Sequence, residues 1–467
     1  MSRPLRARHT LHVRSRGLLL LGMTLALLTG VLQTATASAA SHAPHRIVIG
    51  YAPAGRDAIA NAARLGSTAD EPSVRTRVVN LAAGSSLSRT LARVRREPGV
   101  AWAVPDYVAH AAEGPGSEFV PDDPGEGHEA GDWRELQWNL NGPFGVGAPK
   151  AWDNLIRDGH PGGRGVVIAV LDTGVAYTNR GRFHRSPDFG RFQFVKGHDF
   201  INGGSFALDR NGHGTFVAST IAENTDNGYG LTGLAYGASI MPVRVLDTQG
   251  EGEASTIAQG VRFAVNHGAR VINLSLEFAP TVTAREIPEL ISAIRDAHKR
   301  GVLVVGAAGN EAHKAIAYPA RAPYVVSVGA TTEHGCLAAY SNDGSGLTIA
   351  APGGGPDANL PGDPNCHPEL PSGRDIFQVT LRGGSPRKFG IPRGYEGTSM
   401  ATPHVSAAAA LIIASGVLGR HPSPTTIVAR LRATARKLGG GGDEALYGAG
   451  LVDAAAATSP GGPYAVG

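Results

Sequence analysis

At 467 residues the chain exceeds what a single core of ordinary size would use, so we expect two or three domains and processing of a precursor. Hydrophobic residues make up 42% and charged residues 18%, which is typical of a well-packed globular protein and excludes a disordered chain or a coiled coil. The net charge is +4, but no basic stripe with interleaved aromatic residues occurs, so nucleic acid is not expected as a partner.

Residues 1–40 have the pattern of a secretory signal peptide. Several arginines precede an apolar run over residues 18–32, and small residues follow at 37–40. The alternative, a membrane anchor, requires about 20 apolar residues, and this run is shorter and interrupted by glycine and threonine. We therefore expect a secreted, extracellular protein without a stable membrane anchor.

Residues 41–112 predict a small α+β domain. Strand-like apolar runs alternate there with helical stretches: strands at 47–51, 78–79 and 100–104, a first helix rich in Ala and Arg, and a second helix at 87–96. Residues 113–131 are acidic, rich in Gly and Pro, and without periodicity, which favours a linker with an exposed cleavage site.

Residues 132–458 predict the main α/β domain, followed by a C-terminal tail at 459–467. Continuous apolar runs bounded by glycine indicate strands of a parallel sheet with helices on both faces, a three-layer arrangement. Right-handed crossovers would place functional loops at the carboxyl ends of these strands. The clearest strands are at 165–171, 271–274 and 302–305, and the clearest helices at 257–266 and 287–299.

Three segments carry residue types suited to acyl transfer, which needs a serine, a base and a group that orients the base. Asp172 follows a buried apolar run in LDTG, His213 stands between glycines in NGHGT, and Ser399 lies in GTSMATPH ahead of a small-residue helix at 405–414. Taken singly, each has a structural alternative: a turn, a satisfied histidine and a helix N-cap.

Together, the three strings resemble the signatures of the subtilisin-like serine peptidase family, in that family's chain order. The motifs VRVL (243–246), NLSL (273–276), AAGN (307–310) and YGAGLV (447–452) fall where the family has its equivalents, and the resemblance runs from about Gln137 to Ala457. It implies a serine-type endopeptidase in which Asp172, His213 and Ser399 form a catalytic triad and hydrolyse peptide bonds through an acyl-enzyme.

The resemblance also assigns residues around the triad. Asn310 would stabilise the oxyanion together with the backbone N–H of Ser399. Protein or peptide substrates would add an extended strand to two exposed edges. These edges correspond here to Gly250, Gly252, Ser275 and Leu276, and the floor of the pocket for the residue on the acyl side of the cut (P1) corresponds to Ala317.

Two features leave the P1 preference open. Glu277 and Phe278 stand where the family commonly has two glycines, whereas Ala317 carries no acid and so argues against a strict requirement for Arg or Lys. Glu251 and Glu253 would either favour a basic residue further upstream or be solvated surface charge, and we expect the second.

No cofactor is expected for the chemistry, but the resemblance implies a structural calcium ion. Gln137, Asp188 and Asn227, the last in the loop 223–231, fall where the family places oxygen ligands, and a solvated turn is the alternative. The only two cysteines, Cys336 and Cys366, allow one disulfide, which is favoured over two free thiols in an exported protein.

The segment 97–106 resembles the family's inhibitory propeptide. Residues 41–112 would then assist folding, occupy the active site and be removed by a cut between about His110 and Glu118, leaving a monomer. Two other interpretations remain: an inactive relative that only binds peptides, and a dedicated processing enzyme whose insertion at 352–393 narrows access.

Overall fold

The computed structural model describes residues 42–51, 68–69, 76–82, 85–107, 118–191, 193–440 and 443–465. The chain divides into two compact units, Met1–Ala109 and His110–Gly467, and each is described by itself. The predicted signal peptide and the first predicted helix of the N-terminal domain lie outside the described residues. Within them, no helix is long and apolar enough to cross a membrane.

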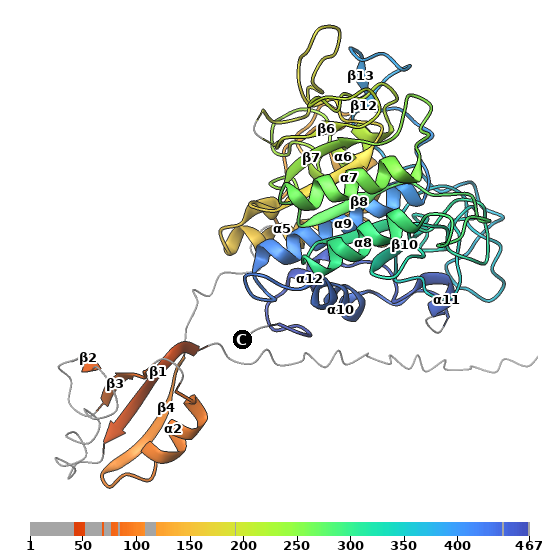
Figure 1. Cartoon of the computed structure of the whole chain (residues 1–467). Helices are drawn as coiled ribbons and strands as arrows, with labels where there is room; N and C mark the ends of the chain where they lie inside the picture. The colour runs from red at the N-terminus through yellow and green to blue at the C-terminus, as the bar shows by residue number, and fades with distance from the viewer. Residues whose placement is uncertain are drawn as a thin grey trace, which may run out of the picture. The chain divides into compact units, whose positions relative to one another are not determined.

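The N-terminal unit is a small antiparallel sheet with one described helix (Figure 1). Its strands lie in the order β2-β3-β1-β4, and Ser86 caps the helix by accepting a hydrogen bond from the N–H of Arg89. Ile47, Ile49 and Val79 form its core with side chains of the helix. The predicted α+β domain is confirmed, with β1 at His42–Tyr51, β2 at Thr68–Ala69, β3 at Thr76–Asn80, α2 at Leu87–Val94 and β4 at Val100–Tyr107.

The second unit is built on a seven-stranded parallel sheet in the order β11-β10-β9-β8-β5-β7-β6. Almost every residue of the central strands is buried, which explains why they are continuous apolar runs in the sequence. The strands are β5 Val167–Asp172, β6 His198–Asp199, β7 Ser239–Arg244, β8 Val271–Leu274, β9 Leu303–Ala307, β10 Val325–Thr331 and β11 Ile349–Pro352.

Helices cover both faces of this sheet, so the predicted three-layer architecture is confirmed. Because strand residues alternate between faces, Leu171 packs with α7 (Ala254–Asn266) and α8 (Pro288–Lys299), whereas Val170 packs on the opposite side. The opposite layer consists of α5 Ala148–Arg157, α6 His213–Ala222, α9 Thr398–Ser415, α10 Pro424–Thr434 and α12 Ala454–Thr458.

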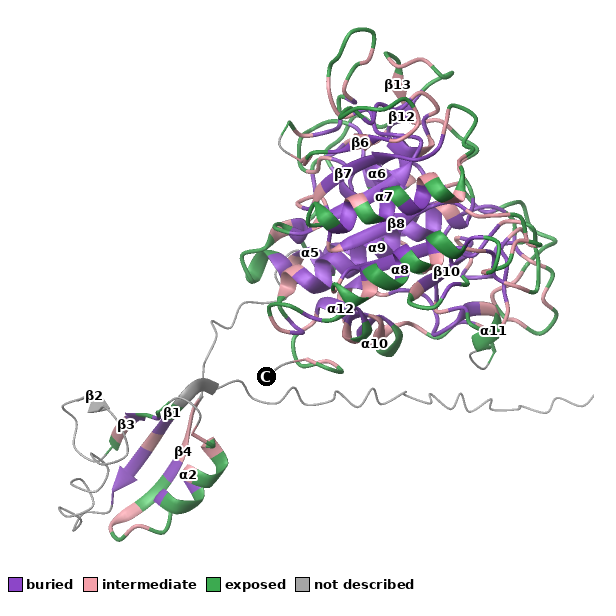
Figure 2. Cartoon of the chain, in the orientation of Figure 1, coloured by how far each residue is buried: buried purple, intermediate pink, exposed green. Residues whose placement is uncertain are grey.

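Helix α9 lies in the interior of the unit. Figure 2 shows it buried along its length, whereas α7 and α8 expose their outer sides. A helix that is apolar on all sides is stable only when other elements surround it. The serine at its start is therefore held by an element that cannot move independently of the core.

Residues 118–131, which the sequence predicts to be part of a linker, pack instead onto the second unit. The N–H of Phe119 donates to Asp153 Oδ1 (2.9 Å), Trp133 Nε1 donates to the carbonyl of Pro121 (3.1 Å), and Asp123 is fully buried. Two acids of this segment, Asp122 and Asp123, accept hydrogen bonds from the backbone N–H groups of residues 226–228. The helices α3 (Trp133–Leu136) and α4 (Trp138–Asn141) follow directly.

The C-terminal residues are also attached. The buried Arg430 of α10 donates to the carbonyls of Ala457 (2.9 Å) and Ser459 (2.6 Å). The remaining short elements are η1 Pro161–Gly163, the hairpin β12 Thr380–Leu381 with β13 Phe389–Gly390, and α11 Glu444–Tyr447.

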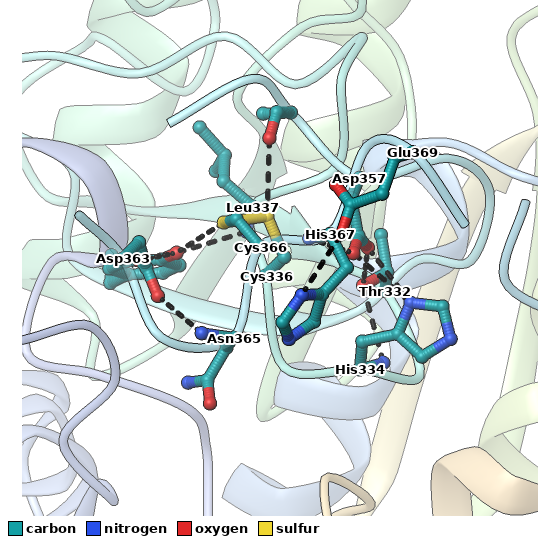
Figure 3. The surroundings of a disulfide bond; sticks show 12 residues. Thr332, His334, Cys336, Leu337, Asp357, Asp363, Asn365, Cys366, His367 and Glu369 are labelled. Atoms are coloured by element: carbon teal, nitrogen blue, oxygen red, sulfur yellow. Dashed lines mark hydrogen bonds and ion pairs between the residues drawn. A yellow bond between two sulfur atoms is a disulfide. The ribbon is translucent and has the colours of Figure 1, made fainter. Parts of the chain in front are cut away.

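Cys336 and Cys366 form the predicted disulfide, which closes a loop of 30 residues (Figure 3). The hydroxyl of Tyr447 accepts from the N–H of Leu337 (3.1 Å) and donates to Asp363 Oδ2 (2.6 Å) beside it. The bond therefore lies inside a network that joins three segments far apart in the sequence.

Candidate active site

Asp172 and His213 meet at the carboxyl end of the sheet. Asp172 is the last residue of β5, His213 is the first of α6, and His213 Nδ1 lies 2.8 Å from Asp172 Oδ1. The carboxylate is fully buried and also accepts from the N–H of Thr173 (2.7 Å). A Cβ on Gly214 would lie 2.2 Å from the carbonyl of Gly174, so this approach of strand and helix requires glycine.

The surroundings of His213 favour its charged form. Burial by itself lowers the pKa of the imidazole, but the charge and hydrogen bond of Asp172, with a contribution from Asp209, outweigh burial, so the pKa lies above its ordinary value. An imidazolium formed during a reaction would therefore be stabilised at this position.

Asp209 is a second buried carboxylate, which sequence analysis missed. It accepts hydrogen bonds from the N–H of Asn211 (2.9 Å), Gly212 (3.0 Å) and Thr215 (3.0 Å), and from the hydroxyl of Thr173 (3.0 Å). It thus fixes the backbone on both sides of His213 relative to β5. In the sequence, Asp209 is only an acid four residues before the histidine. That spacing alone does not distinguish a structural role from a surface charge.

Ser399 enters the same site from the first turn of α9. It lines a cavity of about 460 Å³ that His213 also lines. Its hydroxyl donates to the carbonyl of Ser275 (3.2 Å), and no hydrogen bond joins it to His213 in the described structure. The structure therefore places His213 and Ser399 at one cavity and buries Asp172 against the histidine, with the Asp–His contact made and the His–Ser contact open. Such contacts are often loose without substrate and tighten when it binds.

The side chain of Asn310 is oriented by the start of α9. Its Oδ1 accepts hydrogen bonds from Thr398 N (2.8 Å) and Thr398 Oγ1 (3.0 Å). Because the oxygen must face these donors, the NH₂ group points the other way, where Nδ2 donates to Glu277 Oε1 (2.9 Å). The backbone N–H of Asn310 donates to Glu277 Oε2 (3.1 Å).

Strand pairing explains how Glu277 reaches Asn310. In the register of β8 and β9, Leu274 lies opposite Gly306. Glu277 and Gly309 each follow three residues later, so the two segments leave the sheet side by side. Gly309 has a φ of +113°, and a Cβ there would lie 2.4 Å from Glu277 Oε2. Sequence analysis recorded Glu277 only as a departure from the family pattern, since nothing local shows which side chain it meets.

The Glu277 carboxyl has an unusual affinity for a proton. Burial and the neighbouring carboxyl of Glu311 raise its pKa to about 7, although the hydrogen bonds from Asn310 act in the opposite direction. Near neutral pH, the charge next to Asn310 therefore changes with small changes in proton concentration.

The predicted substrate-binding residues divide into two groups. Gly250, Gly252, Ser275 and Leu276 all line the cavity that contains His213 and Ser399, as do Glu277 and Phe278. Ala317 does not: its side chain is only 2% exposed, and its N–H donates to the carbonyl of Ala308 (2.8 Å).

The insertion at 352–393 contributes no residue to the lining of this cavity. Part of it packs behind the histidine instead. Ser219 Oγ of α6 donates to the carbonyl of Val379 (2.9 Å), and Thr380 Oγ1 donates to the carbonyl of Gly212 (2.6 Å). This part of the insertion supports the start of α6.

The predicted calcium ligands gather around the loop 223–231, where their side chains are hydrogen-bonded within the protein. Gln137 exchanges two hydrogen bonds with the backbone of Thr232 (2.8 and 3.0 Å), and Asn227 turns a donor, Nδ2, toward Asp188 Oδ1 (2.9 Å). No group of three or more His, Cys, Asp or Glu side chains suited to a metal occurs in the described part of the chain. As oriented, Asn227 turns a donor and not an oxygen toward Asp188, an arrangement that does not suit a calcium ion shared by these two side chains.

A buried carboxyl pair occupies this place. Glu223 and Asp188 are both fully buried, Glu223 Oε1 accepts from Val379 N (3.2 Å), and Glu223 Oε2 has no donor. Burial raises the pKa of Asp188 to about 8, and burial and the Asp188 charge raise the pKa of Glu223 well above its ordinary value. The raised pKa values favour the protonated form of one of the two carboxyls, which would provide a donor for Glu223 Oε2.

Comparison with known proteins agrees with this geometry. The profile of the "Subtilase family" matches residues 163–450, which include all three residues of the candidate triad. The chain belongs to the subtilase family. This subtilase is accordingly a serine-type endopeptidase that acts on protein substrates, as the sequence predicts.

Its relatives include proteins named as subtilisins and alkaline proteases. The subtilase is 38% identical over 298 residues to Subtilisin BL of Lederbergia lenta, a match that covers 63% of this chain and 91% of that protein. It is equally similar to an alkaline protease of Shouchella clausii, of which 65% is covered. Among solved structures, a protease from Pseudoalteromonas arctica superposes with a TM-score of 0.57 at 31% identity, covering 73% of this chain and 99% of that one.

Proposed function

We propose that this subtilase hydrolyses peptide bonds with Asp172, His213 and Ser399 as its catalytic triad. The observation that carries the proposal is the 2.8 Å contact between His213 and the buried Asp172, at a cavity that Ser399 also lines. His213 Nε2 takes the proton of Ser399 Oγ as the oxygen attacks the carbonyl carbon, while Asp172 holds the imidazole in the required tautomer. His213 then protonates the leaving amine, and water releases the acyl group in the same way.

Charge on the carbonyl oxygen is stabilised by two donors, the NH₂ group of Asn310 and the backbone N–H of Ser399. The substrate lies extended between the edges at Gly250–Gly252 and Ser275–Leu276. The reaction uses side chains and water alone. Removing a donor equivalent to Asn310 costs about 100- to 1,000-fold in kcat in a subtilisin, and we carry this range over to Asn310.

The chain is also proposed to be a secreted, self-inhibited precursor that matures to a monomer. Residues 1–40 would direct export, and residues 41–112 would block the active site until they are cut off. The division of the chain at Ala109 and the packing of Phe119 on the second unit support a cut between about His110 and Glu118. Residues 118–131 would then remain with the mature enzyme.

A fluorophosphonate probe and N-terminal sequencing test both parts. When the full-length chain is expressed, the protein recovered from the medium should begin between residues 110 and 119, label with the probe and cleave casein. Ser399→Ala should not label, should lose activity at least about 1,000-fold and should retain its N-terminal domain. Ser205→Ala, an exposed serine, is the matched control and should behave like the unmodified protein. Full activity of Ser399→Ala would refute the triad.

A further inference from the structure

Glu277 lies beside the group that would bind the oxyanion. Its carboxylate accepts both hydrogen bonds that Asn310 donates, from Nδ2 (2.9 Å) and from the backbone N–H (3.1 Å). It lines the same cavity as His213 and Ser399. A carboxylate here takes up one of the two N–H donors of the NH₂ group that the reaction needs and lies beside the other.

This contact must break for the reaction to proceed. Negative charge that develops on the substrate oxygen would lie next to the negative charge of Glu277, and like charges at this range are strongly unfavourable. Asn310 cannot turn away, because Thr398 holds its Oδ1 with two hydrogen bonds. The group that moves is therefore Glu277.

Glu277 also lacks a positive partner. No Lys, Arg or His in the described part of the chain forms an ion pair with Glu277 or with its neighbour Glu311, and the nearby Lys314 pairs with Asp343 (2.9 Å). The NH₂ group of Asn342 donates to Glu311 Oε2 (2.7 Å), which satisfies that oxygen without neutralising it.

The other titratable groups of the cavity do not supply a cation either. Glu251 lines it and is acidic, and the only basic side chain in the lining, His213, is already paired with Asp172. The described cavity is therefore acidic around Glu277. Half-buried acids without a counter-ion favour a ligand that brings one.

We propose that Glu277 makes this subtilase selective for Arg or Lys at P1. The inference rests on the proposed roles of Ser399 and Asn310. The P1 Cα is one bond from the carbonyl carbon whose oxygen binds Asn310, so a long basic side chain starting there reaches Glu277. The guanidinium or ammonium group then replaces Asn310 as the partner of Glu277 and leaves the NH₂ group of Asn310 free for the oxyanion.

A residue with an apolar P1 side chain cannot make this exchange. Binding it would leave Glu277 either on Asn310, where it blocks the oxyanion, or without a partner in a half-buried site. The selectivity should therefore appear in kcat as well as in KM, because the released donor acts in the transition state.

The test uses the purified mature enzyme at pH 9 and peptides that differ only at P1, with Arg, Lys or Leu. The unmodified enzyme should cleave the Arg and Lys peptides with a kcat/KM at least about tenfold above the Leu peptide. Glu277→Gln keeps the shape and removes the charge, and it should bring the three values within about threefold of one another. Glu277→Gly, which also frees Asn310, should raise kcat for the Leu peptide.

Glu289→Gln is the charge-matched control, since Glu289 is exposed at the start of α8 and outside the cavity, and it should keep the P1 preference. Unselective cleavage by the unmodified enzyme, or undiminished preference in Glu277→Gln, would overturn the inference and leave the proposed function intact. Failure to cleave any of the peptides, together with failure to label Ser399, would overturn both.

Discussion

At the scale of single residues, the charge of Glu277 controls the surroundings of Asn310. Its carboxyl is half-buried, and burial together with Glu311 raises its pKa to about 7. Above that pH the group is ionised and attracts a cation, and below it the group is neutral and does not. Glu251, which lines the same cavity, adds to the negative field, and His213 becomes positive as the pH falls.

The preference for basic P1 residues should therefore depend on pH. Between pH 9 and pH 6 the ratio of kcat/KM for the Arg and Leu peptides should fall by about tenfold, because Glu277 gains a proton and loses its attraction for the guanidinium. Protonation of His213 reduces cleavage of both peptides and largely cancels in the ratio. In Glu277→Gln the ratio should stay flat, and a flat ratio in the unmodified enzyme would contradict the assignment.

At the scale of elements, the loop 223–232 is fixed by carboxyl groups from two directions. From the N-terminal side, Asp123 accepts hydrogen bonds from the N–H groups of Asp226 (2.9 Å) and Asn227 (3.1 Å). From the segment between β5 and β6, Asp188 accepts from the N–H of Leu231 (2.9 Å) and lies beside Glu223. The segment 118–131 and this loop thus stabilise each other, and both carry acids whose loss would release backbone donors.

The buried pair makes stability fall as the pH rises. In the unfolded chain these carboxyls lose their protons near pH 4, whereas in the fold Asp188 keeps its proton up to about pH 8, so the fold binds more protons between these values. Glu223→Gln cannot ionise and can donate to Asp188. In a Ser399→Ala background, which prevents autolysis, it should raise the Tm at pH 8 by about 2 °C or more and change it little at pH 5.

Chelation distinguishes this arrangement from a metal site. EDTA should leave the Tm of the Ser399→Ala protein unchanged at both pH values, as measured by differential scanning calorimetry. A drop in Tm with EDTA, or destabilisation by Glu223→Gln at pH 8, would indicate a cation between the carboxyls instead of a proton.

At the scale of the whole molecule, the disulfide joins segments that the sheet alone does not hold. Cys336 follows β10, and Cys366 lies in the insertion, next to residues that bond to Tyr447 near the C-terminus. The hydroxyl of Thr332 donates to Asp357 (2.6 Å), and His334 lies 3.1 Å from the same carboxylate, so polar contacts continue the connection (Figure 3).

Removal of the disulfide should destabilise this subtilase substantially. Replacing both cysteines by serine should lower the free energy of unfolding by roughly 3 to 4 kcal/mol, because a 30-residue loop gains freedom in the unfolded chain. Urea denaturation of the Ser399→Ala protein, with and without the two substitutions, measures the difference. Adding reductant should lower the free energy of unfolding of the disulfide-bonded protein by the same amount and should not affect the variant. Equal urea midpoints for the two proteins without reductant would contradict the prediction.

Much of this molecule could be predicted from local patterns. The glycine-bounded apolar run 165–171 indicated a buried parallel strand, and the longer run of small residues after Ser399 indicated a helix. The strings around Asp172 and His213 identified the candidate triad because their glycines and their order are specific in combination. The two cysteines left a single possible pairing.

The tertiary structure decided which distant side chains meet. Glu277 and Asn310 are separated by 33 residues and come together only because β8 and β9 pair in one register. Asp123 likewise finds its donors 103 and 104 residues away, which turned an expected linker into part of the fold. A sequence pattern specifies the periodicity and burial of one element, whereas contacts between elements depend on how the whole core packs, and the charges of the candidate site are set by those contacts.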